Sequence, residues 1–154
     1  MKHYFLLVFG FLQITIFAQD ISDFEKPPVF PECENQDVNT LKNCFYNELS
    51  QFVFTNFKVP QVVQDENYNG EVVVLFEVNA EGNFVVIYID AIYDELKEET
   101  KRVFAELPKI RPASYNGITT FKQYSYHIKI PLVNPAEQSI KYAAIVDNIQ
   151  ISEL

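Results

Sequence analysis

The segment 70–90 has the two-residue period of β-strands and contains a turn at its centre. Its first half places Val72, Val74, Phe76 and Val78 on one face, and its second half does the same with Phe84, Val86 and Tyr88. Between them, residues 79–83 contain Gly82, which can adopt the positive φ that a tight turn needs. The pattern predicts a β-hairpin.

The opposite face of this hairpin is also apolar. It carries Val73, Leu75, Val85, Ile87 and Ile89. A sheet that is apolar on both faces needs cover on both, or a binding partner. Cover by other elements of the same chain is the commoner of these two arrangements.

A third strand is predicted over residues 121–132, where apolar and polar side chains alternate. The apolar set is Tyr124, Tyr126, Ile128, Ile130 and Leu132, and the polar set is Gln123, Ser125, His127 and Lys129. His127 therefore belongs to the polar face. The preceding segment, 109–117, is expected to be extended and to turn at Asn116–Gly117.

Two segments have the helical period instead. From Thr40 onward, apolar residues recur at helical spacing, namely Leu41, Phe45, Leu49, Phe52 and Val53. Asn39 or Thr40 is the expected N-cap, and Pro60 marks the end of the helix. The segment 91–108 predicts a second helix, with a buried stripe of Ile92, Leu96, Val103 and Leu107. Residues 61–69 are expected to form a polar connection.

These elements predict an α+β fold, in which two helices pack on a three-stranded antiparallel sheet over residues 39–132. Residues 19–38 are rich in proline and predict an extended arm, which could span roughly 70 Å at full stretch. Residues 133–154 form a C-terminal tail. A helix over about 136–147 is one interpretation of the tail, and short strands are another.

The first 18 residues have the features of a secretory signal peptide. Lys2 and His3 precede an apolar run over 4–17, and Ala18 provides a small residue at the expected cleavage site. An uncleaved membrane anchor is less consistent with the pattern, because the run is short and Gln13 interrupts it, whereas a span needs roughly 20 residues. We expect an exported protein in the periplasm or associated with the outer membrane.

The charge of the chain argues against nucleic acid as a partner. The net charge is −9, and loss of Lys2 with the signal peptide would make it −10, since 11 basic and 21 acidic residues would remain. Such a surface is repelled by phosphate backbones and by anionic lipid head groups. Hydrophobic residues make up 48% of the chain, which is enough for a packed core.

The two cysteines, Cys33 and Cys44, are expected to form a disulfide, because both lie in the exported part. With His127 as the one histidine after residue 18, they cannot complete a four-ligand zinc site. Their spacing also differs from the Cys-x-x-Cys pattern of redox enzymes. No cofactor or metal is expected.

The sequence contains no evident catalytic set. The acidic residues of 94–106 alternate with Lys97, Lys101 and Arg102, which is typical of a solvated helix face. His127 has no serine or cysteine partner suggested by the sequence, so a surface histidine is the simpler interpretation than a general base. We therefore expect a protein that is not an enzyme.

Several motifs, in the same order, resemble the TonB C-terminal domain family in its divergent Bacteroidetes form. Residues 28–34, PVFPECE, are similar to a PxFPGCE segment that often precedes this domain, with Glu32 in place of glycine. Residues 58–60 stand at the family's Tyr-Pro motif without the tyrosine. Residues 70–84 follow its GxVxVxFxVxxxGxV hairpin, and 107–117 follow its P…PaxxnG stretch. The family's motif and turn positions correspond to Pro60, Gly70, Gly82, Pro112 and Gly117.

The resemblance implies binding without catalysis. Domains of this family pack helices on an antiparallel sheet and capture an extended segment of an outer-membrane TonB-dependent transporter by strand addition. The corresponding edge here is the strand 121–132, and the candidate binding residues are Phe121, Gln123, Tyr124, Ser125, Tyr126, His127 and Lys129. The family's energy transducers have an inner-membrane helix and a long spacer. A cleaved signal and an arm of about 20 residues are instead expected for a soluble or outer-membrane-associated relative.

Three functions remain open at this point. The first is an envelope protein-binding module that acts in TonB-dependent transport or envelope assembly. The second is a structural or dimerising protein, in which 121–132 pairs with a second copy or with the tail. The third, an enzyme, depends only on scattered carboxylates and one histidine.

The signal peptide leads to the first testable prediction. Protein recovered from the envelope should begin at Gln19, because the apolar run ends at the small Ala18. Intact-mass spectrometry measures this directly. A mass that includes residues 1–18 would contradict cleavage and support a membrane anchor.

Overall fold

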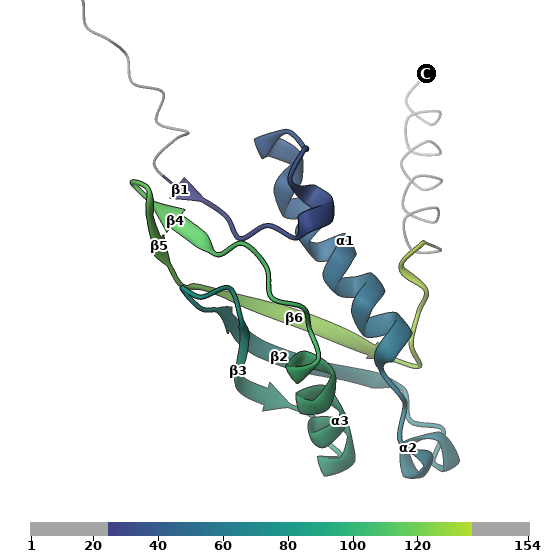
Figure 1. The fold of residues 1–154 in the computed structure, drawn as a ribbon. Helices are drawn as coiled ribbons and strands as arrows, with labels where there is room; N and C mark the ends of the chain where they lie inside the picture. The colour runs from purple at the N-terminus through teal and green to yellow at the C-terminus, as the bar shows by residue number, and fades with distance from the viewer. Residues whose placement is uncertain (1–24, 137–154) are drawn as a thin grey trace, which may run out of the picture.

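The computed structural model describes residues 25–136 and has an α+β architecture (Figure 1). The elements in chain order are β1 (Glu25–Lys26), the 3₁₀ helix η2 (Pro31–Cys33), α1 (Val38–Asn56), α2 (Gln61–Asp65), β2 (Gly70–Val78), β3 (Phe84–Asp90), α3 (Asp94–Ala105), β4 (Ala113–Tyr115), β5 (Ile118–Thr120) and β6 (Lys122–Ile130). The expected signal peptide and most of the expected tail lie outside the described residues.

The predicted α+β class with antiparallel strands is confirmed, but the single sheet of the prediction is incomplete. The main sheet has the order β3-β2-β6, and a second three-stranded sheet has the order β1-β4-β5. The second sheet forms because the arm returns to residues far along the chain, with Glu25 opposite Tyr115. The connection 61–69, expected to be polar, contains the short helix α2, which buries Val63.

The predicted hairpin is confirmed and depends on Gly82. The amide of Gly82 donates to the carbonyl of Asn79 at 2.9 Å, and Gly82 has a φ of 86°. A Cβ at this position would lie 1.9 Å from the carbonyl oxygen of Ile110. Glycine is therefore required here both by the backbone conformation and by the close approach of another segment.

Helix α1 begins two residues earlier than predicted. Its N-cap is Asp37, whose side chain accepts a hydrogen bond from the amide of Asn39 at 2.9 Å. Asp37 carries a short carboxylate that satisfies an amide of the first turn, so Asn39 and Thr40 become helical residues. The amide of Phe57 donates to the carbonyl of Val53 at the C-terminal end.

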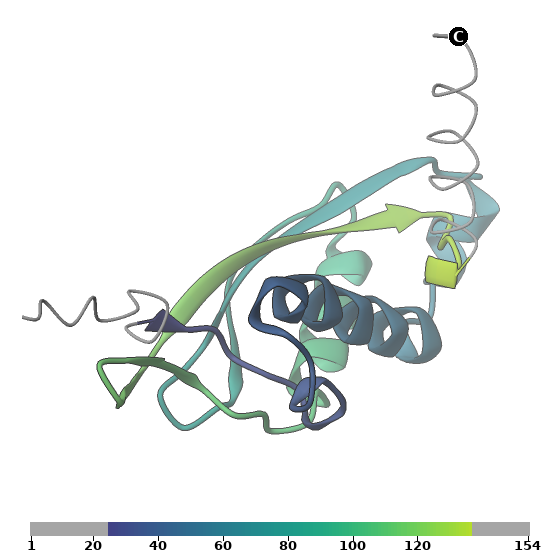
Figure 2. The same cartoon turned by 90° about the horizontal axis from the view of Figure 1, so that it is seen from above.

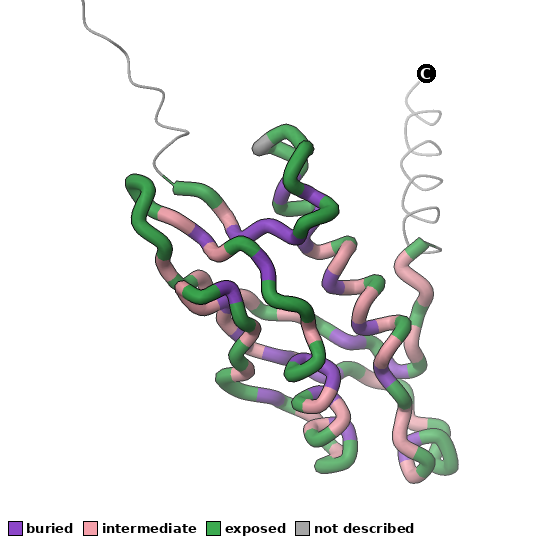
Figure 3. The backbone as a smooth tube through the Cα atoms, in the orientation of Figure 1, coloured by how far each residue is buried: buried purple, intermediate pink, exposed green. Residues whose placement is uncertain are grey.

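The core lies on one face of the main sheet. Val72, Val74, Phe76 and Val78 of the central strand β2 are all fully buried. Helices α1 and α3 lie on the same side of the sheet (Figure 2), and the buried positions of the chain line this space (Figure 3). Phe76 contacts α3 through Phe104, with ring centroids 5.1 Å apart.

The buried face of α3 differs from the predicted stripe at one end. Leu96 and Val103 are fully buried, as predicted, and Leu107 is partly buried. Ile92 is 76% exposed, because it lies before the first turn of the helix, and its prediction was wrong. Thr100, which was not part of the predicted stripe, is buried on the same face of the helix. Its hydroxyl donates a hydrogen bond to the carbonyl of Leu96.

The predicted disulfide between Cys33 and Cys44 is present, with a Cα–Cα distance of 5.9 Å. The arm is extended at β1 but forms a 3₁₀ turn at residues 31–33, in which the amide of Cys33 donates to the carbonyl of Phe30. This turn brings Cys33 against α1 and buries Val29 and Phe30 in the core. Among residues 25–136, no helix is long and apolar enough to cross a membrane.

The disulfide is expected to stabilise the fold. Replacing Cys33 and Cys44 together with alanine should lower the free energy of unfolding by about 3 kcal/mol, because the bond closes a loop of 11 positions. Chemical denaturation of the oxidised protein and of the double variant measures the difference. Equal stabilities, or two thiols that react with a labelling reagent in the native protein, would contradict this assignment.

Candidate functional site

Strand β6 forms one edge of the main sheet. It pairs with β2 over nine residues in a continuous antiparallel register, from Gly70 opposite Ile130 to Val78 opposite Lys122. Within residues 25–136, no strand lies along its other side (Figure 1). This edge is the one for which the sequence predicted partner binding.

The hydrogen bonds of the hairpin turn show which backbone groups of β6 are unpaired. The amide of Asn79 donates to the carbonyl of Asn83 at 2.9 Å, so the backbone of Asn79 faces β3. Because backbone groups alternate in direction along a strand, those of Val74 and Phe76 face β6. Their partners in the register are Tyr126 and Tyr124, whose backbone groups therefore face β2.

The intervening residues of β6 direct their backbone groups outward. These residues are Gln123, Ser125, His127 and Lys129. Each presents one N–H donor and one C=O acceptor, and no backbone hydrogen bond joins them to another segment of the described chain. Such a row can template a further strand.

The opposite edge of the sheet, β3, is less suited to strand addition. Its pairing with β2 shifts register, so that Leu75 faces Tyr88 while Phe76 faces Val86. Ile87 is the extra residue of this β-bulge, which bends the strand and interrupts the regular row of backbone groups. Edge strands with bulges resist further pairing, whereas β6 has no such irregularity.

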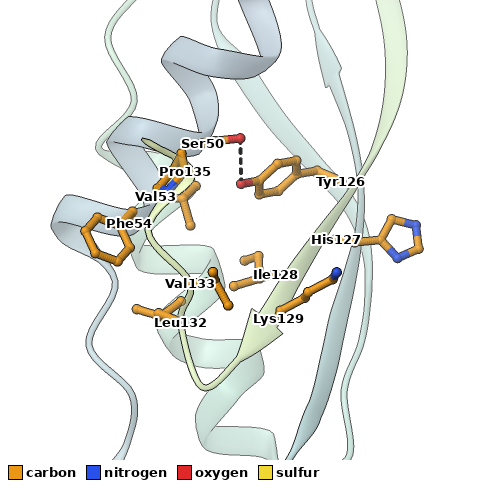
Figure 4. Close-up of a pocket in the computed structure, with 10 residues that line it drawn as sticks. All are labelled: Ser50, Val53, Phe54, Tyr126, His127, Ile128, Lys129, Leu132, Val133 and Pro135. Atoms are coloured by element: carbon orange, nitrogen blue, oxygen red, sulfur yellow. Dashed lines mark hydrogen bonds between the residues drawn. The ribbon is translucent and has the colours of Figure 1, made fainter. Parts of the chain in front are cut away.

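Two separate hollows lie between β6 and α1, and together they are called the groove. The first is lined by Glu25, Pro27, Pro28, Lys42, Phe45, Tyr46, Lys122 and Tyr124, and its volume is about 440 Å³. The second is smaller, about 120 Å³, and is lined by Ser50, Val53, Phe54, Tyr126, His127, Ile128, Lys129, Leu132, Val133 and Pro135 (Figure 4). The alternating tyrosines of β6 thus contribute one side chain to each hollow.

A hydrogen bond joins the strand to the helix at the smaller hollow. The hydroxyl of Tyr126 donates to Oγ of Ser50 at 3.1 Å (Figure 4). Burial raises the pKa of Tyr126, and burial is also the main cause of the raised pKa of Tyr124. Both hydroxyls are protonated at neutral pH, and that of Tyr126 acts as a donor to Ser50.

Two side chains of β6 have carboxylate neighbours. The ammonium group of Lys122 pairs with Glu25 of β1, which lowers the pKa of that carboxyl. Nδ1 of His127 lies 3.2 Å from Oε2 of Glu71, and both side chains are about half exposed. His127 is on the exposed polar face, as predicted, and its partner is a neighbouring carboxylate of the same sheet.

The second face of the main sheet is only partly covered. Val85, Ile87 and Tyr88 are 41%, 45% and 60% exposed, while Val73 and Leu75 are intermediate. The prediction that Tyr88 shares a face with Phe84 and Val86 was wrong, because the bulge at Ile87 reverses the alternation and places Ile89 in the core instead. Only one of the two apolar faces is therefore covered by helices of the described chain. The other face is an exposed apolar area beside the polar side chains of β6.

The remaining motif positions have structural roles. Pro60 is the N-cap of α2, and Gly70 begins β2, where a Cβ would lie 2.2 Å from the hydroxyl oxygen of Tyr68. Gly117 has a φ of 77° in the turn between β4 and β5. Pro112 lies near Gly82, so the hairpin turn and the segment before β4 pack together. Phe121 precedes β6 and is 58% exposed.

Sequence reasoning missed the contribution of α1 to the groove. Tyr46 and Ser50 are one helical turn apart and face β6. Their spacing of four residues was a usable signal, because positions i and i+4 share a face. Both were left out of the predicted stripe, because that stripe selected only strongly apolar residues.

Within the described part of the chain, no group of three or more histidine, cysteine or acidic side chains is arranged to hold a metal ion. No protein-family model matches this chain, and no curated protein matches it. Any functional assignment therefore depends on the geometry of the groove and on the edge of β6.

The Tyr126–Ser50 hydrogen bond supplies a test of the groove. Tyr126→Phe and Ser50→Ala should each lower the free energy of unfolding by about 1 kcal/mol, because each removes one partner of a partly buried hydrogen bond. A double-mutant cycle measured by denaturation should give a coupling energy of about 0.5–1 kcal/mol. Additive effects would show that α1 and β6 are not joined here.

Proposed function

We propose that this protein is a non-catalytic binding module of the cell envelope that captures an extended protein segment by strand addition at β6. The observation that carries the proposal is the row of outward backbone groups at Gln123, Ser125, His127 and Lys129. This mode of recognition agrees with the resemblance to the TonB C-terminal domain family. The partner would be an envelope protein, such as an outer-membrane TonB-dependent transporter.

Backbone hydrogen bonds would supply most of the affinity. A bound segment can bond to every second residue of β6, through both the amide and the carbonyl of each. A net contribution of about 1 kcal/mol per bond is typical, and part of it is offset by the loss of freedom of the captured segment. Such a site is suited to reversible capture of a flexible chain.

The groove would supply selectivity. Alternate side chains of an added strand point to opposite faces of the sheet. Those on one face would approach the larger hollow beside Tyr124, whose lining is mostly apolar, and the smaller, more polar hollow beside Tyr126. Those on the other face would lie beside Gln123, Ser125 and His127. A segment that alternates apolar and polar residues fits both surfaces.

The disulfide supports the proposed placement of the protein in the cell envelope. The Cys33–Cys44 bond is typical of an oxidising environment such as the periplasm. The proposed placement in the periplasm or at the outer membrane also depends on the predicted signal peptide. A role in TonB-dependent transport or in envelope assembly would be consistent with this placement.

Self-association through the same edge is the second candidate function, since an unpaired edge strand can pair with its own copy. The charges of β6 weigh against it. Lys122 and Lys129 are the lysines of this strand, and lysine on an edge opposes pairing with an identical edge. Lys129 would favour a partner segment that carries an acidic residue, whereas the charge of Lys122 is already offset by Glu25.

Proline substitution tests strand addition directly. Ser125→Pro and His127→Pro each remove an amide that faces the free edge, so capture of the partner should fall by about tenfold or more. Ser125→Ala and His127→Ala keep those amides and should bind within about threefold of the wild type. The measurement is partner retention from native envelope extract, with thermal unfolding of each variant to verify the fold.

The outcomes separate the candidate functions. If folded proline variants retain the partner and His127→Ala loses it, a side-chain site replaces strand addition. If the wild type is a stable dimer by size-exclusion chromatography with light scattering, and the proline variants are monomers, the edge serves self-association. Either result would contradict the proposal.

A further inference from the structure

The hairpin formed by β4 and β5 exposes apolar side chains at its tip. Tyr115 and Ile118 are 57% and 73% exposed, and the register places them directly opposite each other on one face. The turn between them, 116–117, has positive φ at both residues, as tight two-residue hairpins require. Phe121, which follows β5, is 58% exposed. Exposure of neighbouring apolar groups to water is unfavourable and marks a surface that a partner covers.

The tip projects from the rest of the molecule. Figures 1 and 2 both place the turn between β4 and β5 at the end of the described chain that lies opposite α2. Residues 115–119 are all exposed (Figure 3). A Cβ on Gly117 would meet no residue other than its chain neighbours within 4 Å. The tip is therefore convex and free to touch a surface larger than itself.

The base of the hairpin is fixed to the body of the protein. Ala113 and Ile110 are buried, and the amide of Ile110 donates to the carbonyl of Gly82 at 3.0 Å. Arg111 exchanges two backbone hydrogen bonds with Val29, at 3.0 and 3.1 Å. The fold thus holds the apolar tip out in solvent, away from the core.

The hairpin lies in a stretch of the sequence without acidic residues, although the chain as a whole has a net charge of −9. No aspartate or glutamate occurs between Glu106 and Glu137, and residues 112–121 carry no charge at all. The basic residues that flank this uncharged segment are Lys109, Arg111 and Lys122. An uncharged apolar tip with basic residues behind it differs from the rest of the surface.

Two of the three basic side chains have a carboxylate neighbour. Arg111 lies 3.6 Å from Glu34, and Lys122 pairs with Glu25. Lys109 has no carboxylate partner within residues 25–136. The base of the hairpin therefore keeps a small positive charge. Repulsion from anionic head groups, which the acidic chain as a whole would experience, is offset at this place.

These features fit a membrane interface better than a protein pocket. Tyrosine combines an apolar ring with a polar hydroxyl, and it is enriched at the level of lipid head groups. Ile118 would enter the boundary of the acyl chains, while the basic residues behind the tip would lie near the phosphates. A protein partner would instead need a concave pocket shaped to this convex tip.

We propose that the tip of the β4–β5 hairpin inserts into the surface of a phospholipid bilayer, with Tyr115 and Ile118 as the inserted side chains. This site goes beyond the proposed function, since it does not involve the edge of β6. It would hold the binding module at a membrane while that edge stays open to a partner. A single apolar tip gives weak, reversible attachment, unlike a spanning helix.

Vesicle sedimentation tests the insertion with protein recovered from the envelope. The wild type should pellet with phosphatidylethanolamine vesicles that contain about one quarter phosphatidylglycerol. Tyr115→Ser/Ile118→Ser should weaken binding by ~10-fold or more, because it removes the inserted apolar area. The matched control, Val85→Ser/Ile87→Ser, removes an exposed apolar pair from the main sheet and should bind like the wild type. Thermal unfolding verifies the fold of each variant.

A fluorescent reporter gives a second test in which the apolar tip is kept. The chain contains no tryptophan, so Ile118→Trp introduces a single indole at the tip. Its emission should shift to shorter wavelength when vesicles are added. The emission of Ile92→Trp should not shift, although the side chain of Ile92 is as exposed, at 76%.

Several results would overturn the proposal. They are a wild type that does not pellet, a Tyr115→Ser/Ile118→Ser variant that pellets equally, and an equal shift of both tryptophans. A shift of Ile118→Trp emission that rises with protein concentration without lipid would indicate a second copy instead. One that needs envelope protein and not lipid would indicate a protein pocket. Ser125→Pro should leave vesicle binding unchanged, so this inference and the proposed function can each fail alone.

Discussion

The rest of the structure depends on the central position of β2 in the main sheet, where it is paired with a strand on each side. This strand bonds to β3 on one side and to β6 on the other, while Val72, Val74, Phe76 and Val78 are buried beneath the helices. A shift of register by one residue would place charged side chains such as Glu71 and Glu77 in the core. The register with β6 is therefore firmly specified, and with it the direction of every backbone group along the edge.

This constraint connects the core to the candidate site. The inward side chains of β6, Tyr124 and Tyr126, face α1 because the same residues bond to β2 through their backbones. Consequently the residues that expose polar side chains also expose backbone donors and acceptors. Even-numbered residues of β6 direct their side chains into the groove, and odd-numbered residues direct their backbone groups to the free edge. Substitutions at even positions should therefore alter contacts in the groove, and substitutions at odd positions should alter contacts at the edge and the polar face.

Much of the fold could be predicted from local patterns. Alternation identified the three strands of the main sheet, helical spacing identified α1 and α3, and Gly82 marked the hairpin turn. The second sheet could not be predicted, because the pairing of Glu25 with Tyr115 joins segments 90 positions apart without a local signal. The N-cap at Asp37 and the exposure of Ile92 depend on where a helix begins, which periodicity defines only within a few residues.

The candidate edge was proposed from its alternation, but its availability depends on strand order. Only the arrangement β3-β2-β6 shows that β6 is at an edge, and only the hydrogen bond of Asn79 shows which of its amides point outward. The role of Tyr46 and Ser50 similarly required the placement of α1 beside β6. Local sequence reasoning cannot supply these relations, because each joins residues that lie far apart in the chain.

The central claim is that β6 receives an extended segment of another protein through its backbone. Nuclear Overhauser contacts in a complex of the isotope-labelled chain with its unlabelled, captured partner test this claim most directly. The account predicts contacts between backbone protons of the partner and the amide protons of Gln123, Ser125 and His127, at alternate positions along the strand. Contacts confined to side chains of the exposed sheet face, such as Val85 and Tyr88, with none at these amides, would contradict it.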